Sequence, residues 1–251
     1  MSPKPVDTPT QPKNRANRWA ILTVAAAVLL LSSVISVSAG AFDVDRIDFR
    51  GLHRVSYDEA IQAAGIKLGD FMGTLDVGGA RDALGELPWV HSAQVRRLWG
   101  GAVEVDIVER APVALALTAP ESWVLVDREG RVLTTVLATP PALPRLSGIA
   151  AAPAVGDYLA PDADALLEVL DTADGQLGFV VAALWRDGRG DVGARVRRQS
   201  DGAVFEATLG DDSAIGAKTA AIAAVIPGLT PPGAFLDVSV AHLPVVRAPT
   251  R

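Results

Sequence analysis

An uncharged stretch of 22 residues, AILTVAAAVLLLSSVISVSAGA at positions 20–41, sets the strongest limit on what this chain can become. As a helix it would be about 33 Å long, and the hydrocarbon core of a bilayer is about 30 Å thick. Arg15, Arg18 and Trp19 precede it, and basic and aromatic residues favour the membrane interface. The sequence therefore predicts a transmembrane helix over 19–41, with these three residues at the cytoplasmic interface.

The charge on either side of this stretch predicts its orientation. Residues 1–19 hold four basic residues and one acidic residue, a balance of +3, while the whole chain has a net charge of −6. The remainder therefore carries −9, and the positive-inside rule places the tail 1–18 in the cytoplasm, as a disordered segment, and the acidic body outside. A cleaved signal peptide is the alternative, because Val37-Ser38-Ala39 fits a small-residue cleavage site. Both interpretations predict an exported body.

The segment 42–110 has the pattern of a small α+β unit with the order β-α-α-β-β. Apolar and charged residues alternate in FDVDRIDFRG, which predicts a half-buried strand. Ser56 and Glu59 have the spacing of a capping box at the start of a helix, and Gly65 supplies its end. The order of elements predicts one sheet whose helices lie on a single face.

The second half of this unit completes the sheet. Asp76 is expected to cap a second helix over 77–87, which a proline then terminates. Two strands follow, 90–98 and 102–110, around a Gly-Gly turn. In the last strand the valines and the isoleucine face the helices, so the charged residues between them are expected on the solvent side.

This unit resembles the POTRA domain of the bacterial division family FtsQ, also called DivIB. The resemblance is strongest over 84–114, and it covers the rest of the chain more loosely. One departure is Arg-Leu-Trp-Gly-Gly, where the family shows Arg-x-Trp-Pro; glycine replaces proline readily in a turn. The matching positions are Ile47, Gly51, Leu87-Pro88-Trp89-Val90, Ala93, Val95, Arg97, Trp99 and Glu109-Arg110-Ala111-Pro112-Val113-Ala114.

A second unit over 111–247 is predicted to be a mostly antiparallel β domain with flanking helices, followed by a short tail, 248–251. Segments with the apolar alternation of strands, segments with helical periodicity and turn residues follow one another along this unit. Its expected elements are a hairpin at 123–133, a helix at 162–173 capped by Asp162, a buried strand at 176–185, a hairpin at 195–209, a helix at 213–226 and a strand at 235–240.

The last of these strands is the candidate contact site. Pro244 lacks an amide donor, which places the segment 235–240 at a sheet edge. Exposed edges bind peptides by strand addition, and the family resemblance implies that FtsB/DivIC-like and FtsL-like membrane proteins bind the final strands. Ordinary core packing is the alternative for the aliphatic side chains. The candidate contacts are Leu236, Asp237, Val238, Ser239, Val240, His242 and Lys218.

No pattern of catalytic residues appears in the sequence. Its three histidines lie far apart, no cysteine is present, and no nucleophile, metalloprotease or phosphate-loop motif occurs. Asp211 and Asp212 are expected to cap the following helix. The pairs Arg96-Arg97 and Arg197-Arg198 are expected to lie on solvated faces, and contact with a partner or with lipid headgroups is the alternative. The acidic body also argues against nucleic-acid binding.

Taken with the resemblance, these features predict a non-enzymatic protein without a cofactor. The family implies a bitopic scaffold of the divisome in the plasma membrane at the division septum, which links early division components to septal peptidoglycan synthesis. A POTRA-containing module of export or envelope assembly is the alternative.

Overall fold

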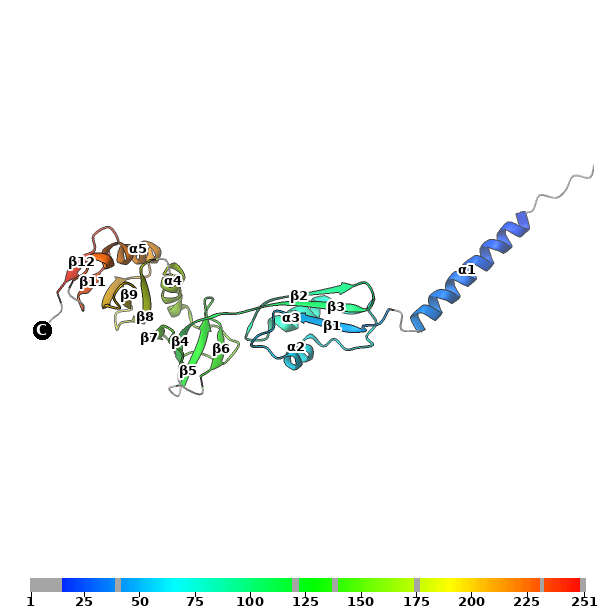
Figure 1. Ribbon diagram of the computed structural model, residues 1–251, viewed down its shortest axis with the longest axis horizontal. Helices are drawn as coiled ribbons and strands as arrows, with labels where there is room; N and C mark the ends of the chain where they lie inside the picture. The colour runs from blue at the N-terminus through cyan, green and yellow to red at the C-terminus, as the bar shows by residue number, and fades with distance from the viewer. Residues whose placement is uncertain are drawn as a thin grey trace, which may run out of the picture.

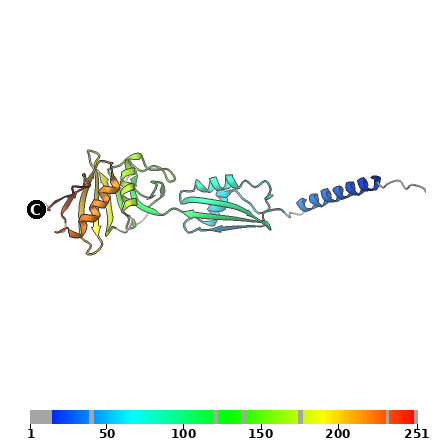
Figure 2. The ribbon, with the colours of Figure 1, turned by 90° about the horizontal axis from the view of Figure 1, so that it is seen from above.

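The computed structural model describes residues 15–38, 42–118, 122–136, 140–173, 177–230 and 233–248. An N-terminal helix, a small α+β domain and a larger β domain follow one another along the long axis of the molecule (Figures 1 and 2). The predicted α+β class is thus confirmed. Residues 1–14 of the expected tail, residues 39–41 of the expected span and residues 249–251 lie outside the described residues.

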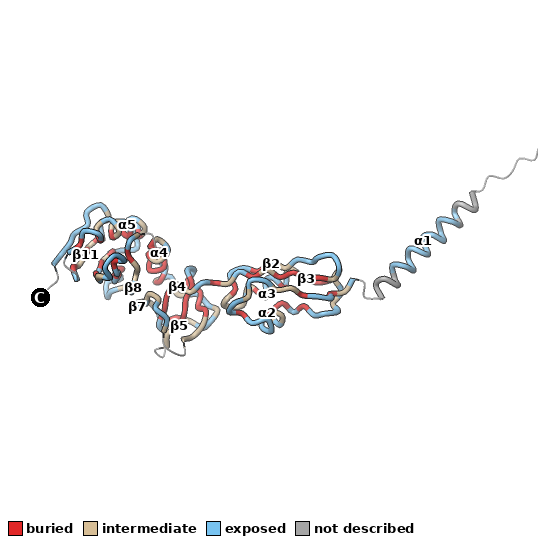
Figure 3. Tube along the Cα trace, viewed as in Figure 1, coloured by how far each residue is buried: buried red, intermediate tan, exposed pale blue. Residues whose placement is uncertain are grey.

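The first helix, α1, covers Arg15–Ser38, so it begins inside the segment predicted to be a disordered tail. Its described side chains from residue 21 to residue 33 are all exposed, in contrast to the two folded domains (Figure 3). In the part of the chain that is described, none of the helices reaches both the length and the hydropathy required to cross a membrane.

The small domain is formed by β1 (Arg46–Arg50), α2 (Tyr57–Ala64), α3 (Val77–Gly85), β2 (Val90–Leu98) and β3 (Ala102–Glu109). Its sheet has the order β1-β3-β2, with β3 parallel to β1 and antiparallel to β2. The predicted order β-α-α-β-β is confirmed.

Both N-caps predicted in the small domain are confirmed. The Ser56 hydroxyl accepts a hydrogen bond from the Glu59 amide at 3.2 Å, and Asp76 accepts one from the Gly79 amide at 2.8 Å. Gly65 ends α2 in a left-handed conformation that residues with a Cβ rarely adopt. The helix α3 ends two residues earlier than expected, before the proline is reached.

One face of this sheet packs on the helices, but its other face is less solvated than the alternation predicted. Val103, Val105 and Leu84 are fully buried in the core. Glu104, on the opposite face, is only 7% exposed because two arginines from neighbouring strands cover it. Arg50 lies 2.5 Å and Arg96 lies 2.7 Å from its carboxylate oxygens. The expectation of an exposed Glu104 was wrong, since cross-strand ion pairs bury it.

The larger domain holds a nine-stranded sheet with the order β12-β11-β10-β9-β8-β7-β4-β5-β6. Its pairs are antiparallel except β10–β11, β7–β8 and β4–β7, so the prediction of a mostly antiparallel sheet is confirmed. The strands are β4 (Pro112–Thr118), β5 (Ser122–Asp127), β6 (Val132–Thr135), β7 (Arg145–Ser147), β8 (Phe179–Arg186), β9 (Val192–Arg198), β10 (Val204–Gly210), β11 (Phe235–Asp237) and β12 (Val245–Arg247).

Two helices, α4 (Asp164–Thr172) and α5 (Ile215–Val225), pack on each other and on this sheet (Figure 2). The 3-10 turns Pro161–Ala163 and Ile226–Gly228 adjoin them. The main hydrophobic core lies between these helices and the sheet, with Phe179, Phe205 and Ile222 at its centre.

Two further expectations for this domain were wrong. Asp162 does not cap α4, because the 3-10 turn places it before the helix, where its carboxylate accepts a hydrogen bond from the Ala150 amide at 2.6 Å. The strand β8 was expected to be buried throughout, but only Phe179 and Leu184 are buried in it. An apolar run does not distinguish a strand with one covered face from a strand with two.

Candidate functional site

The predicted contact strand is shorter than expected and does not form the sheet edge. The strand β11 ends at Asp237 and lies between β10, its parallel neighbour, and β12, its antiparallel neighbour. Leu236 and Val238 are completely buried, so their side chains belong to the core. Pro244 lies directly before β12, and the edge that it signals is β12.

Asp237 and Ser239 form the bend that follows β11. The Asp237 carboxylate accepts hydrogen bonds from the Ser239 hydroxyl at 2.7 Å and from the Ser239 amide at 3.1 Å. The hydroxyl bond, aided by the amide and by Arg247, holds the pKa of Asp237 below its usual value against the opposing effect of burial. These two residues therefore shape the turn that brings β12 back onto β11.

An exposed apolar surface lies around this turn. Val240 is 46% exposed and His242 is exposed beside it. Three further residues of this surface were not predicted: Leu243 is 65% exposed, Val245 49% and Val246 46%. The signal for them was present, since two β-branched residues directly after a proline are typical of an edge strand.

The register shows which backbone groups of β12 face outward. The Val238 amide donates to the Thr208 carbonyl of β10 at 2.9 Å, so the preceding residue, Asp237, directs its backbone groups toward β12. Asp237 pairs with Val245, whose backbone groups therefore face β11. Val246, the next residue, directs its N–H and C=O away from the sheet. No described strand pairs with β12 on that side.

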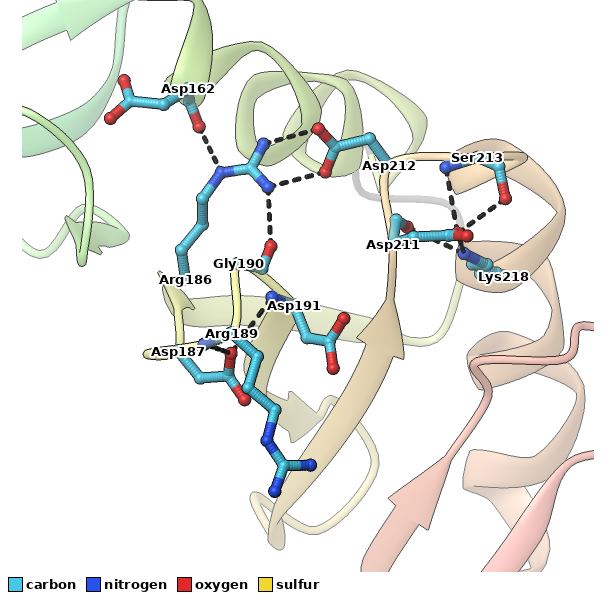
Figure 4. A network of polar contacts seen from close by, with 10 residues as sticks. All are labelled: Asp162, Arg186, Asp187, Arg189, Gly190, Asp191, Asp211, Asp212, Ser213 and Lys218. Carbon is cyan, nitrogen blue, oxygen red and sulfur yellow. Dashed lines mark hydrogen bonds and ion pairs between the residues drawn. The ribbon is translucent and has the colours of Figure 1, made fainter.

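Lys218 lies inside the domain rather than on its surface. Its side chain is 3% exposed, and its ammonium donates to the Asp211 carboxylate at 2.6 Å and to the Asp211 carbonyl at 2.8 Å. Figure 4 shows this contact at the start of α5. The hydrogen bond from Lys218, with those from Ser213, lowers the pKa of Asp211 to about 2. Lys218 thus holds the loop before α5 and is not placed to contact a partner.

The carboxylates that were expected to cap α5 serve other contacts. Asp212 receives two hydrogen bonds from the guanidinium of Arg186, at 2.7 and 2.9 Å, and the same guanidinium donates to the Asp162 carbonyl (Figure 4). The N-cap of α5 is Ala214, which has no side-chain cap. Asp211 and Asp212 are therefore each paired with a separate cation, and they do not form an acid–base pair.

The pair Arg197-Arg198 was predicted to lie on a solvated face, but Arg198 is largely buried. The side chain of Arg198 is 10% exposed and binds Asp201 at 2.7 Å, and it donates to the carbonyls of Ile226 and Leu229 at 2.8 and 3.0 Å. It therefore fixes the chain that follows α5. Arg97 donates to the Leu75 carbonyl, which ties β2 to the loop before α3.

The described residues contain no cluster of three or more side chains that could hold a metal ion. His53 contacts the Gly51 carbonyl at 3.1 Å, and His91 lies 3.5 Å from Glu129, so these two are part of local polar contacts. Of the predicted interface residues, Trp19 is 70% exposed on α1. Arg15 and Arg18 lie in the first turns of that helix, and their side chains lie outside the described part.

A buried polar joint connects the two folded domains. Arg110, at the end of the small domain, binds Asp127 at 2.5 Å and Glu129 at 2.7 Å in the larger one. Arg131, in the larger domain, contacts the small domain in turn: its guanidinium donates to the carbonyls of Gly85 and Glu86 at 3.0 and 2.9 Å. The domains are therefore held in one orientation by contacts that cross the boundary in both directions.

The comparisons with known proteins agree with this architecture. The family model described as "POTRA domain, FtsQ-type" matches residues 42–110. A cell division protein FtsQ of Novosphingobium aromaticivorans is 34% identical over 122 residues. Those of Corynebacterium glutamicum and Streptomyces venezuelae are 29% and 28% identical over 128 and 193 residues. The small domain is therefore a POTRA domain of the FtsQ type, and beyond it the chain is similar to these FtsQ proteins. The resemblance seen in the sequence is thus confirmed.

The matches to these FtsQ proteins differ in extent. The Novosphingobium match covers 48% of this chain and 38% of that protein, and the Corynebacterium match covers 50% and 56%. The Streptomyces match covers 73% of this chain and 69% of its relative. The chain thus spans between about a third and just over half the length of the first FtsQ relatives that it matches.

Proposed function

We propose that this chain is a non-enzymatic scaffold of bacterial cell division, anchored in the plasma membrane at the division septum. In this role it links early division components to septal peptidoglycan synthesis through FtsB/DivIC-like and FtsL-like membrane proteins. The observation that carries the proposal is the free outer edge of β12, where a partner segment has backbone groups to pair with.

The apolar helix α1 supports the membrane anchor. Its described large side chains are exposed; Ile21, Leu22 and Leu29, for example, are 67%, 60% and 69% exposed. Such a surface is costly in water and favourable in lipid. The tail before it is cytoplasmic by the positive-inside rule, and the two folded domains lie on the outer side.

The partner is proposed to add a strand beside β12 and to cover the apolar surface around it. The outward N–H and C=O of Val246 would pair with the incoming backbone, while Val240, Leu243 and Val245 would be buried against its side chains. His242 lies within the same exposed turn. Because β12 is only three residues long, affinity depends on both kinds of contact.

A proline at one position of β12 tests strand addition. Val246→Pro removes the outward amide donor, whereas Val246→Thr keeps the donor and a β-branched side chain of similar size. We expect the proline variant to lose about fivefold or more in affinity for an FtsB-like partner, since the lost hydrogen bond at the edge is worth about 1 kcal/mol. The amount of partner that co-purifies with each full-length variant from detergent-solubilised membranes measures this loss of binding.

The threonine variant controls for the apolar contact, and far-UV circular dichroism for the fold. A folded Val246→Pro variant that binds as well as the native chain would exclude strand addition at β12. In cells, a fluorescent protein fused to the N-terminus is expected to form a band at the division site. The band should disappear when residues 84–247 are removed, and a uniform envelope signal from the intact chain would contradict the proposed role.

A further inference from the structure

The end of the small domain that faces α1 carries an exposed aromatic surface. A hollow of about 570 Å³ opens there, and the side chains of Phe42, Phe71, Met72, Leu98 and Trp99 line it. We call these five residues the aromatic patch. It lies at the tip of the β2–β3 hairpin, on the side of the domain next to α1 (Figure 1).

The patch is exposed to a degree that folding of the domain does not require. Trp99 is 100% exposed, Phe42 51%, Leu98 41% and Phe71 39%. A fully exposed tryptophan at a hairpin tip contributes little to the stability of its own domain, because it buries no surface there. Exposed apolar clusters of this kind mark surfaces that meet a protein or a membrane.

The chain that leaves α1 is itself part of this surface. The Met72 amide donates to the Phe42 carbonyl at 2.8 Å, and Asp43 forms a β-bridge with Phe71. The Asp45 amide donates to the Gly101 carbonyl at 2.7 Å, which ties the same segment to the hairpin tip.

Three residues lie between Phe42 and Ser38, the last residue of α1, so the two are at most about 14 Å apart along the chain. The patch is therefore tethered close to the end of the helix proposed to lie in the membrane.

We propose that the aromatic patch rests on the outer surface of the phospholipid bilayer that holds α1, with Trp99 among the lipid headgroups. This inference depends on the proposed membrane anchor. Tryptophan and phenylalanine favour the interface, where the ring meets the acyl boundary and the indole N–H meets water. Arg97 lines the same hollow and adds a positive charge suited to anionic headgroups. Asp43 and Asp45, which lie in the chain segment beside the aromatic patch, oppose deeper insertion of the patch into the bilayer.

Such a contact would set the tilt of the whole extracytoplasmic part. A connection to α1 alone would leave the small domain free to rotate, whereas a second contact at the hairpin tip limits that rotation. The buried joint at Arg110 and Arg131 then transmits the orientation to the larger domain. The edge strand β12, at the opposite end of the molecule, would be held away from the membrane (Figure 1).

Site-directed spin labelling of the full chain tests the contact, because the native sequence contains no cysteine. Three single variants are labelled with a nitroxide and reconstituted in phosphatidylethanolamine–phosphatidylglycerol vesicles. Leu98→Cys reports the patch, Val28→Cys reports α1, and Leu243→Cys reports a distant exposed site. The ratio of collision rates with oxygen, which enters lipid, and with a nickel chelate, which stays in water, gives the depth of each label.

We expect a several-fold higher ratio at position 98 than at 243, and the highest ratio at 28. Trp99→Ser, added to each labelled variant, should return position 98 to the value of 243 and leave position 28 unchanged.

A water-like label at 98 beside a lipid-like label at 28 would overturn the contact while the anchor stands. Shielding of position 98 from both reagents would also overturn it, since protein would then cover the patch. A water-like label at 28 would refute the anchor, and the inference with it.

Discussion

Arg110 and Asp127 form a buried ion pair across the boundary between the two folded domains. Their guanidinium and carboxylate groups are 2.5 Å apart, and the side chains are only 6% and 5% exposed. Arg110 also donates to the Val90 carbonyl at 3.0 Å, and Asp127 accepts from the Arg131 amide at 2.8 Å. The pair is thus embedded in a network that leaves neither charge uncompensated.

Removing one member of this pair should be costly. Arg110→Ala leaves the Asp127 carboxylate buried without its cation, and breaking a buried pair in this way costs about 3–5 kcal/mol. The matched control is Arg128→Ala, because Arg128 is 53% exposed and its pair with Asp171 lies on the surface. We expect that change to cost at most about 1 kcal/mol. Denaturant unfolding of both variants measures the difference, and equal losses would contradict a structural role for the buried pair.

Arg131 should control the angle between the domains more than their stability. Its hydrogen bonds to Gly85 and Glu86 cross the boundary, so Arg131→Met is expected to loosen the joint. Spin labels at Ser92→Cys and Ser200→Cys, one exposed site in each domain, would report a broader distance distribution by double electron–electron resonance. Arg195→Met, which removes an exposed pair within the larger domain, should leave the distribution unchanged. An unchanged width in the Arg131 variant would show that other contacts hold the joint.

Local features of the fold were predictable from the sequence because they depend on nearby residues. Ser56, Asp76 and Gly65 act within one turn of the helices that they begin or end, and the pattern of side chains alone reveals them. The hairpin at Gly100-Gly101 was predictable for the same reason.

Features that depend on distant pairing were not predictable. The carboxylate of Asp162 binds an amide twelve residues earlier, and Glu104 is buried by arginines from two other strands. The strands β11 and β12 have three residues each, too few to show a period, so their order at the sheet edge follows only from the fold. The sequence placed the candidate contact strand at 235–240, whereas the strand at the edge of the sheet is β12, Val245–Arg247.

Gly51 should be intolerant of any side chain. Its φ is +81°, and an added Cβ would lie 1.9 Å from the Ile107 carbonyl oxygen of the central strand. Gly100 has nearly the same φ, +80°, with open space around it. Gly100→Ala is therefore expected to cost only the backbone strain, about 1–2 kcal/mol, whereas Gly51→Ala must in addition displace β3. Thermal unfolding should show a clearly larger fall in melting temperature for Gly51→Ala than for Gly100→Ala. An equal fall would mean that β3 moves to accommodate the added methyl group without loss of stability.

The contact between Asp211 and Lys218 predicts a dependence of stability on pH. The folded pKa of Asp211 is about 2, below its usual 3.8, so the contact contributes stability above about pH 4 and loses it as the pH falls toward 2. Asp211→Asn removes the charge, and we expect it to lower the denaturation midpoint at pH 5. The difference from the native chain should shrink steadily below pH 4 and be nearly absent at pH 2.

The control is the neighbouring Asp212→Asn variant, which alters the separate pair with Arg186. It shows how much the stability changes with pH when a different carboxylate of the same loop is removed. A difference between the native chain and Asp211→Asn that stays constant from pH 5 to pH 2 would mean that the ionised carboxylate does not stabilise Lys218. The loop before α5 would then depend on contacts other than this charge, such as the hydrogen bond that the Lys218 ammonium donates to the Asp211 carbonyl.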